Sequence, residues 1–121
     1  MSMFEKDWIL RQIKDMAKMV AVGVLHRSST EYVIVDELAL SEPDKLHLKL
    51  MELLKNGQIK EAQQVLKASM QGANLDYLKV AIDFYDRLCE LSEEDRVKAG
   101  LSIGDIQKGL DDITKEYGIY L

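Results

Sequence analysis

The sequence predicts an all-α fold, a compact bundle of about five or six helices in one domain spanning residues 1–121. Apolar residues recur at steps of three and four along most of the chain, which is the spacing of amphipathic helices. Serines stand three positions before acidic residues at several places, and such pairs cap helix N-termini. Only one short segment is rich in β-branched residues, so a sheet would lack a second strand.

The composition fits one self-sufficient core. At 121 residues with 47% apolar side chains, the chain can bury roughly two-thirds of its unfolded surface without disulfides or a structural metal. Charged residues at 31% and a single proline exclude a disordered or collagen-like chain. The net charge of −5 opposes attraction to nucleic-acid phosphates, so we expect no nucleic-acid partner.

The first helix is predicted over residues 4–26. Its apolar stripe consists of Ile9, Ile13, Met16, Val20 and Val24. Beyond Met19 the helix is apolar nearly all round, so that end needs cover from the rest of the domain or from a second copy of the chain. We therefore expect this helix to be a contact element, with an interaction surface formed by Trp8, Met19, Val22 and Leu25.

Residues 28–41 are predicted to be mostly loop. Residues 32–35, a tyrosine followed by three β-branched residues, suit a strand, whereas residues 36–40 favour a helix. An isolated strand would leave its backbone groups unpaired, because no second strand is available.

The remaining helices are predicted over residues 43–55, 58–70, 75–90, 93–99 and 103–117. Three serines precede aspartates in capping-box variants: Ser41 with Asp44, Ser92 with Asp95 and Ser102 with Asp105. Gly57 and Gly118 are expected to end helices, because glycine tolerates the left-handed conformation.

The helix over residues 75–90 is expected to lie at the centre of the bundle, because most of its circumference is apolar. The last helix packs against it in this prediction. The polar side of the helix over residues 75–90 carries Asp83, Asp86 and Glu90, which we interpret as a solvated seam. Asp83 is expected to pair with Arg87 at the i, i+4 spacing.

The segment over residues 43–70 carries a turn motif. Gly57 permits a tight reversal, Ile59 fills the space beneath it, and Ala62 lets two helix backbones approach closely. The segment resembles the turn between the two helices of a tetratricopeptide repeat, which implies an antiparallel helical hairpin. One copy of the motif is present, covering about a quarter of the chain.

A second resemblance spans nearly the whole sequence. It rests on the segments at residues 3–13, MFEKDWILRQI, at residues 76–85, DYLKVAIDFY, and at residues 109–113, GLDDI. These segments are similar to a family of short uncharacterised bacterial proteins known as a domain of unknown function. The resemblance implies a helical, tetratricopeptide-like fold and brings no activity, substrate or catalytic residue.

The chemistry-bearing residues form no recognisable site. His26 and His47 have no carboxylate or cysteine at metal-ligand spacing, and Cys89, the single cysteine, is expected to be buried and inert. The sequence therefore predicts no catalytic, cofactor-binding or metal-binding residue. With no disulfide to form and no signal peptide in the given sequence, we expect a cytoplasmic location.

The leading functional hypothesis is a non-catalytic interaction or adaptor domain. It would bind a segment of an unknown protein partner, or self-associate as a homodimer through the first helix. The alternative is a peripheral membrane-surface protein that uses this helix, with Phe4 and Trp8 as anchors and Lys6 and Arg11 as basic groups. An enzyme with an unrecognised site is the third hypothesis.

Overall fold

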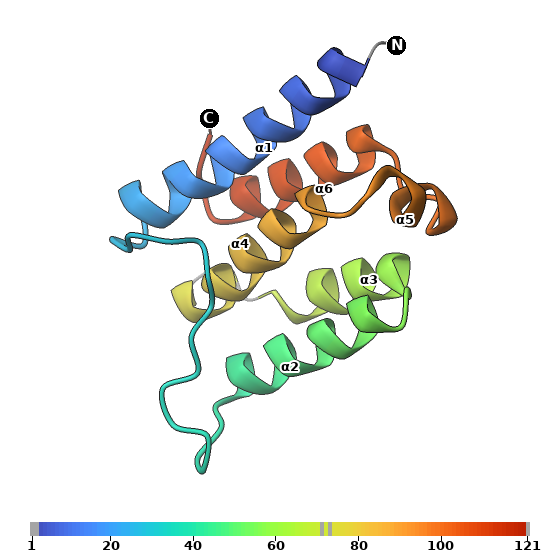
Figure 1. Ribbon diagram of the computed structural model, residues 1–121. Helices are drawn as coiled ribbons and strands as arrows, with labels where there is room; N and C mark the ends of the chain where they lie inside the picture. Colours follow the sequence, from blue (N-terminus) through green and yellow to red (C-terminus); the bar gives the residue numbers. More distant parts are fainter. Residues whose placement is uncertain (1–2, 71, 73, 121) are drawn as a thin grey trace.

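The computed structural model of the chain describes residues 3–70, 72 and 74–120, and for residues 3–7 the backbone alone. The described residues form six α-helices and no strand (Figure 1). This confirms the predicted all-α bundle. The helices are α1 Met3–Gly23, α2 Glu42–Lys55, α3 Ile59–Ser69, α4 Leu75–Cys89, α5 Glu93–Lys98 and α6 Ile103–Glu116.

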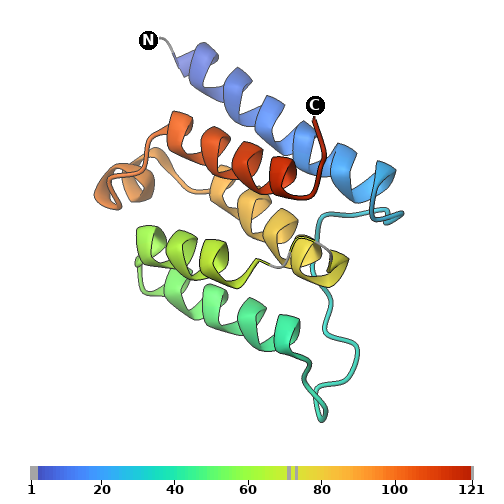
Figure 2. The same ribbon diagram turned by 180° about the vertical axis from the view of Figure 1, so that it is seen from behind.

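Helix α4 is the central element, as the sequence predicts. It packs against α1, α2 and α6, and ten of its fifteen residues are buried. Figures 1 and 2 show α4 running between α6 on one side and the α2–α3 pair on the other. The side chains of Leu78, Phe84 and Leu88 are fully buried, so this helix supplies much of the core.

The predicted caps set the starts of the later helices. Ser41 and Asp44 form a complete capping box: the Asp44 N–H donates to Ser41 Oγ at 3.2 Å, and the Ser41 N–H donates to Asp44 Oδ2 at 3.0 Å. Ser102 and Asp105 form a second complete box at α6. Ser92 makes only the serine half of the arrangement at α5. Each bond satisfies a backbone N–H that the helix leaves unpaired.

Helix α1 ends at Gly23, three residues before the predicted end. The N–H of Leu25 bonds back to the Val20 carbonyl, and His26 takes a positive φ of 54°. This left-handed residue turns the chain out of the helix axis. The apolar pattern continues past Gly23 because Val24 and Leu25 pack against the core from outside the helix.

Helices α2 and α3 form the predicted hairpin (Figure 1). Gly57 has a φ of +75°, which accounts for glycine at this turn. Ile59 and Ala62 are both buried beneath the reversal. The two helices therefore stack closely, and α2 also packs against α4.

A long connection of residues 24–41, here called the strap, joins α1 to α2. It contains no helix or strand, which confirms the prediction of a loop in this region. Figure 1 shows the strap crossing α4 and then turning outward beyond the start of α2. It therefore covers part of the central helix that the helical elements leave open.

Candidate functional site

A groove of about 700 Å³ lies between α3 and α6. Tyr85 of α4 lines its base together with the apolar side chains of Leu101 and Ile113, all three of them buried. Figure 2 shows α4 lying between the two flanking helices. A concave surface of this size, with an apolar base and polar edges, is typical of a binding site.

The shape of the groove depends on a glycine in α6. A Cβ atom at Gly109 would lie 2.3 Å from the Tyr85 hydroxyl oxygen and 2.9 Å from the Gln63 amide nitrogen. Only a residue without a side chain allows this approach. The Gln63 amide donates to the Tyr85 hydroxyl at 3.1 Å, so side chains of α3 and α4 meet directly under the backbone of α6.

We expect Gly109→Ala to lower the free energy of unfolding by about 1–3 kcal/mol, because the new methyl group displaces the rigid Tyr85 ring. Denaturant unfolding measures this. The control is Gly104→Ala in the same helix, where a Cβ would meet nothing closer than Ser102 Oγ at 3.7 Å. That substitution should be neutral or stabilise by up to about 1 kcal/mol. Equal effects at both positions would contradict the close contact at Gly109.

Lysines line both edges of the groove. Lys60 and Lys67 lie seven positions apart on α3, and Lys108 and Lys115 have the same spacing on α6. Each α6 lysine binds a carboxylate of its own helix, at 2.9 and 2.8 Å. Among the described residues, the two α3 lysines form no ion pair. The α3 edge therefore offers positive charge to a ligand.

The carboxylates of the groove are largely engaged. Asp105 accepts the Ser102 N–H in the cap of α6, and this backbone hydrogen bond lowers the pKa of the Asp105 carboxyl. Asp112 binds Lys108. Glu116 is the third acidic residue along the groove. Together with Asp111, which binds Lys115, these carboxylates balance the four lysines in number, so the positive charge of the groove is local to its α3 edge.

A second polar site lies beneath the strap. Tyr32 fastens the strap to two helices: its N–H donates to Asp83 Oδ2 of α4 at 2.8 Å, and its hydroxyl donates to Asp44 Oδ1 of α2 at 2.6 Å. The Tyr32 ring packs against the His47 ring with centroids 4.7 Å apart. We call this group the strap anchor, which consists of Tyr32, Asp44, His47, Asp83 and Arg87.

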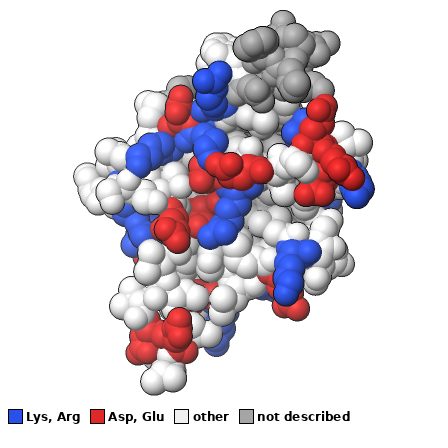
Figure 3. Space-filling view, viewed as in Figure 1, with Lys and Arg blue, Asp and Glu red and all other residues white. Residues whose placement is uncertain are grey.

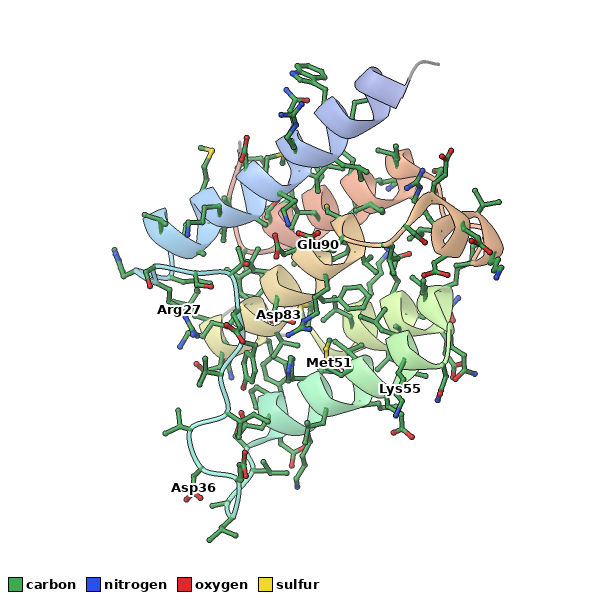
Figure 4. The ribbon with its side chains drawn as sticks, in the orientation of Figure 1. Arg27, Asp36, Met51, Lys55, Asp83 and Glu90 are labelled. Atoms are coloured by element: carbon green, nitrogen blue, oxygen red, sulfur yellow. The ribbon has the colours of Figure 1, made fainter. Side chains whose placement is uncertain are left out.

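The prediction of a solvated seam on α4 is wrong for Asp83, which is only 2% exposed. The strap lies over this part of the helix, and Figure 4 shows Asp83 on the side of α4 that faces it. The expected pairing with Arg87 is confirmed, since Arg87 Nε donates to Asp83 Oδ1 at 2.6 Å. The other two acidic residues of the seam, Asp86 and Glu90, form ion pairs with Lys14 of α1.

His47 is held neutral by its surroundings. Burial lowers the pKa of its imidazole, Asp83 and Asp44 oppose this, and the positive charge of Arg87 adds to it. The His47 Nδ1 atom is buried with no hydrogen-bond partner among the described residues, and it lies 3.8 Å from Asp83 Oδ1. The strap anchor is therefore a largely buried polar cluster with one unsatisfied group, and burial disfavours the protonated form of His47.

We expect the protein to lose stability as the pH falls below about 6.5, because the unfolded chain takes up a proton that folded His47 resists. Because the pKa of His47 is lowered in the folded protein, the free energy of unfolding rises with pH. Below about pH 6.5 the slope is at most about 1.4 kcal/mol per pH unit. Denaturant unfolding between about pH 7.5 and about pH 5 measures the slope. His47→Gln should flatten it, and His26→Gln, at an exposed histidine, should not. An unchanged slope in His47→Gln would contradict the assignment.

The strap turns outward at its tip, residues 33–38. The Leu38 N–H donates to Asp36 Oδ1 at 2.9 Å, and the Ala39 N–H donates to the Asp36 carbonyl at 3.2 Å, so the tip is a compact turn. Val35 is 95% exposed and Leu38 is 99% exposed. Figure 4 shows Asp36 at the far end of the molecule, and Figure 3 shows acidic side chains gathered there beside uncharged atoms.

The structure brings together three of the four residues predicted for the first-helix surface. Trp8, Met19 and Val22 are 57%, 58% and 50% exposed, and their spacing places them on one face of α1. Leu25 lies beyond the end of the helix and packs against the core instead. The side chains of Phe4 and Lys6 lie outside the described residues.

The remaining chemistry-bearing groups lie apart. Cys89 is buried, and burial raises the pKa of its thiol to about 12. In the described part of the chain, histidine, cysteine and carboxylate side chains form no group of three or more suited to a metal ion. Over the same residues, each helix is too short or too polar to cross a membrane.

Sequence reasoning missed both the groove and the strap anchor. The signal for the groove is Gly109, a glycine in the middle of an otherwise regular helical pattern, where a close backbone approach is a common reason. For the strap anchor the only signal is Tyr32, an aromatic residue in a segment predicted to be loop. Its partner Asp83 is 51 positions away, so sequence proximity could not reveal the contact.

Comparison with known proteins supplies a family. No curated protein and no solved structure matches the chain. A family model described as a family of unknown function (DUF6483) matches residues 3–118, nearly the whole chain. The chain, with its α3–α6 groove and strapped central helix, belongs to this family of unknown function.

Proposed function

We propose that the protein is a non-catalytic interaction domain that binds a protein segment in the groove between α3 and α6. The observation that carries this proposal is the concave surface itself, with buried Tyr85 at its base and lysine and glutamine side chains along its edges. The base suits an apolar anchor of a peptide, and the edges suit its polar groups.

The construction of the groove supports a preformed site. Its base is fixed by the contact between Gln63 and Tyr85 under Gly109, and its two walls are helices rather than loops. A rigid surface loses little conformational entropy when it binds, which favours affinity. The hairpin of α2 and α3, with its resemblance to a tetratricopeptide unit, supplies one of these walls.

Selection of peptides from a random library against the wild-type protein tests the proposal. We expect binders whose affinity falls at least about tenfold in Gln64→Trp, because a bulky ring at this exposed position fills the groove. The control is Glu52→Trp, at a position on α2 that is also exposed but lies outside the groove. Absence of binders, or binders that are insensitive to Gln64→Trp, would overturn the proposal.

The exposed face of α1 is a second candidate surface, and it favours self-association as a homodimer. Trp8, Met19 and Val22 project from a helix whose opposite face is buried against the bundle. We expect Val22→Glu to weaken such a dimer in light scattering after size exclusion. A monomer at high micromolar concentration, with stability unchanged in Val22→Glu, would contradict this candidate.

Protein contact is favoured over a membrane surface for α1. Lys14 is engaged by Asp86 and Glu90, and Lys18 donates to the Ser28 carbonyl, so these two lysines are directed to intramolecular partners. Arg11 and Asp15 remain exposed and oppose each other in charge. Co-sedimentation with anionic vesicles at low salt tests the alternative, and clear binding would support it.

A cytoplasmic location is part of the same proposal. The single cysteine is buried and cannot form a disulfide within the chain, which fits a reducing compartment. The net charge of −5 also supports a protein partner over nucleic acid.

A further inference from the structure

We propose that the segment bound in the groove is the strap tip, residues 33–38, of a second copy of this chain. The inference rests on the proposed function, because it names the occupant of the same groove. It joins two features that a single subunit leaves unexplained: a pair of almost fully exposed apolar side chains on the tip, and a groove with a buried aromatic base.

The apolar parts of the two surfaces match. Val35 and Leu38 are the most exposed large apolar residues of the described chain. Leu38 lies in the turn that runs from Asp36 to Ala39, and Val35 directly precedes this turn. The groove offers about 700 Å³ above Tyr85, enough for two aliphatic side chains with part of their backbone. Docking removes these side chains from water, which is the main driving force for association.

The charges of the two surfaces are complementary. Asp36 and Glu37 stand between Val35 and Leu38 and are both exposed. The groove presents Lys60 and Lys67 on its α3 edge without ion-pair partners among the described residues. A tip with two adjacent carboxylates therefore finds two lysines that form no ion pair among the described residues beside an apolar base, although Lys60 already lies in the field of Asp105.

The tip is organised before it docks. Hydrogen bonds to Asp36 close its turn, and Tyr32 fixes the preceding residues to α2 and α4. A segment held in its bound shape avoids much of the entropy cost of binding.

The arrangement requires a second chain. Figures 1 and 2 show the tip beyond the start of α2, whereas the groove lies between α3 and α6, so the two surfaces are distant on one subunit. Because tip and groove are different surfaces, each contact leaves one tip and one groove unused. A second contact can close a reciprocal dimer or add further chains head to tail.

Two double variants separate the two surfaces. The tip variant, Val35→Ser with Leu38→Ser, keeps the groove, and the groove variant, Lys60→Glu with Lys67→Glu, keeps the tip. Sedimentation velocity of the wild type from about 10 μM to about 1 mM should show a mass that rises above that of the monomer. Each variant alone should stay monomeric, and an equimolar mixture of the two should form a dimer that grows no further, since each chain contributes one working surface.

Charge reversal adds a gain-of-function arm. Glu37→Lys, added to the groove variant, should restore part of the self-association that the groove variant alone lacks, and it leaves the Asp36 carboxylate in place in the turn. Trp8→Ser with Val22→Ser on α1 is the control: it removes any dimer formed through α1 but should leave the oligomers formed by tip and groove unchanged. The inference is overturned if the wild type is monomeric at about 1 mM, if the mixture of variants stays monomeric, or if only the α1 variant dissociates the oligomer. Peptide binding in the groove would survive each of these outcomes, so the proposed function stands or falls separately.

Discussion

Replacing Asp83 with alanine is expected to lower the free energy of unfolding by about 2–4 kcal/mol. The carboxylate is 2% exposed and accepts hydrogen bonds from the Tyr32 N–H and from the Arg87 guanidinium. Its removal leaves the Tyr32 N–H without a partner in a partly buried site. Arg87 is partly exposed and can be rehydrated, so the loss is smaller than for a fully buried ion pair.

Denaturant unfolding measures the loss, and amide hydrogen exchange locates it. In Asp83→Ala the Tyr32 amide should exchange much faster than in the wild type, because the strap is released locally. The control is Asp86→Ala on the same helix, whose carboxylate is more exposed and pairs with Lys14 at 3.4 Å. It should cost less than about 1 kcal/mol. A loss in Asp83→Ala no larger than in this control would show that the strap anchor does not hold the strap.

Replacing Phe84 with alanine is expected to cost about 3–5 kcal/mol. The Phe84 side chain is fully buried at the centre of the bundle and packs edge-to-face on Tyr85, with ring centroids 5.2 Å apart. Its removal leaves a cavity where α4 meets its neighbours, and the surrounding helices can fill it only in part.

Leu75→Ala is the matched control for Phe84→Ala. Leu75 is a large apolar residue on the same helix but is 47% exposed. Its truncation should cost less than about 1 kcal/mol, because little apolar surface leaves water there on folding. Thermal unfolding distinguishes the two variants. Similar losses at both positions would contradict the central place of α4.

The helices could be predicted because their signals are local. The pairs Ser41–Asp44 and Ser102–Asp105 each lie within four residues, and both form the complete boxes that this spacing favours. The central position of α4 followed from its nearly continuous apolar surface, since such a helix must be covered on several sides. The end of α1 was placed too late because Val24 and Leu25 stay in the core after the helix has ended.

The groove and the strap anchor depend on contacts between distant segments. Gly109 is explained only by Tyr85, which belongs to another helix, and Asp83 is buried only because the strap crosses it. Amphipathic spacing reports which face of a helix is apolar, and it does not report which loop covers a polar position. The acidic residues on α4 were therefore interpreted as a solvated surface, whereas Asp83 is buried and accepts a hydrogen bond from the Tyr32 N–H.

Mapping of amide chemical shifts tests the central claim most directly, namely that the groove between α3 and α6 is the binding surface. Isotope-labelled wild-type protein, kept dilute, is titrated with a peptide selected against it. We expect the largest shifts along the two walls, from Lys60 to Lys67 and from Lys108 to Lys115, with Tyr85 between them. Shifts confined to the exposed face of α1 around Trp8 and Met19 would contradict the claim.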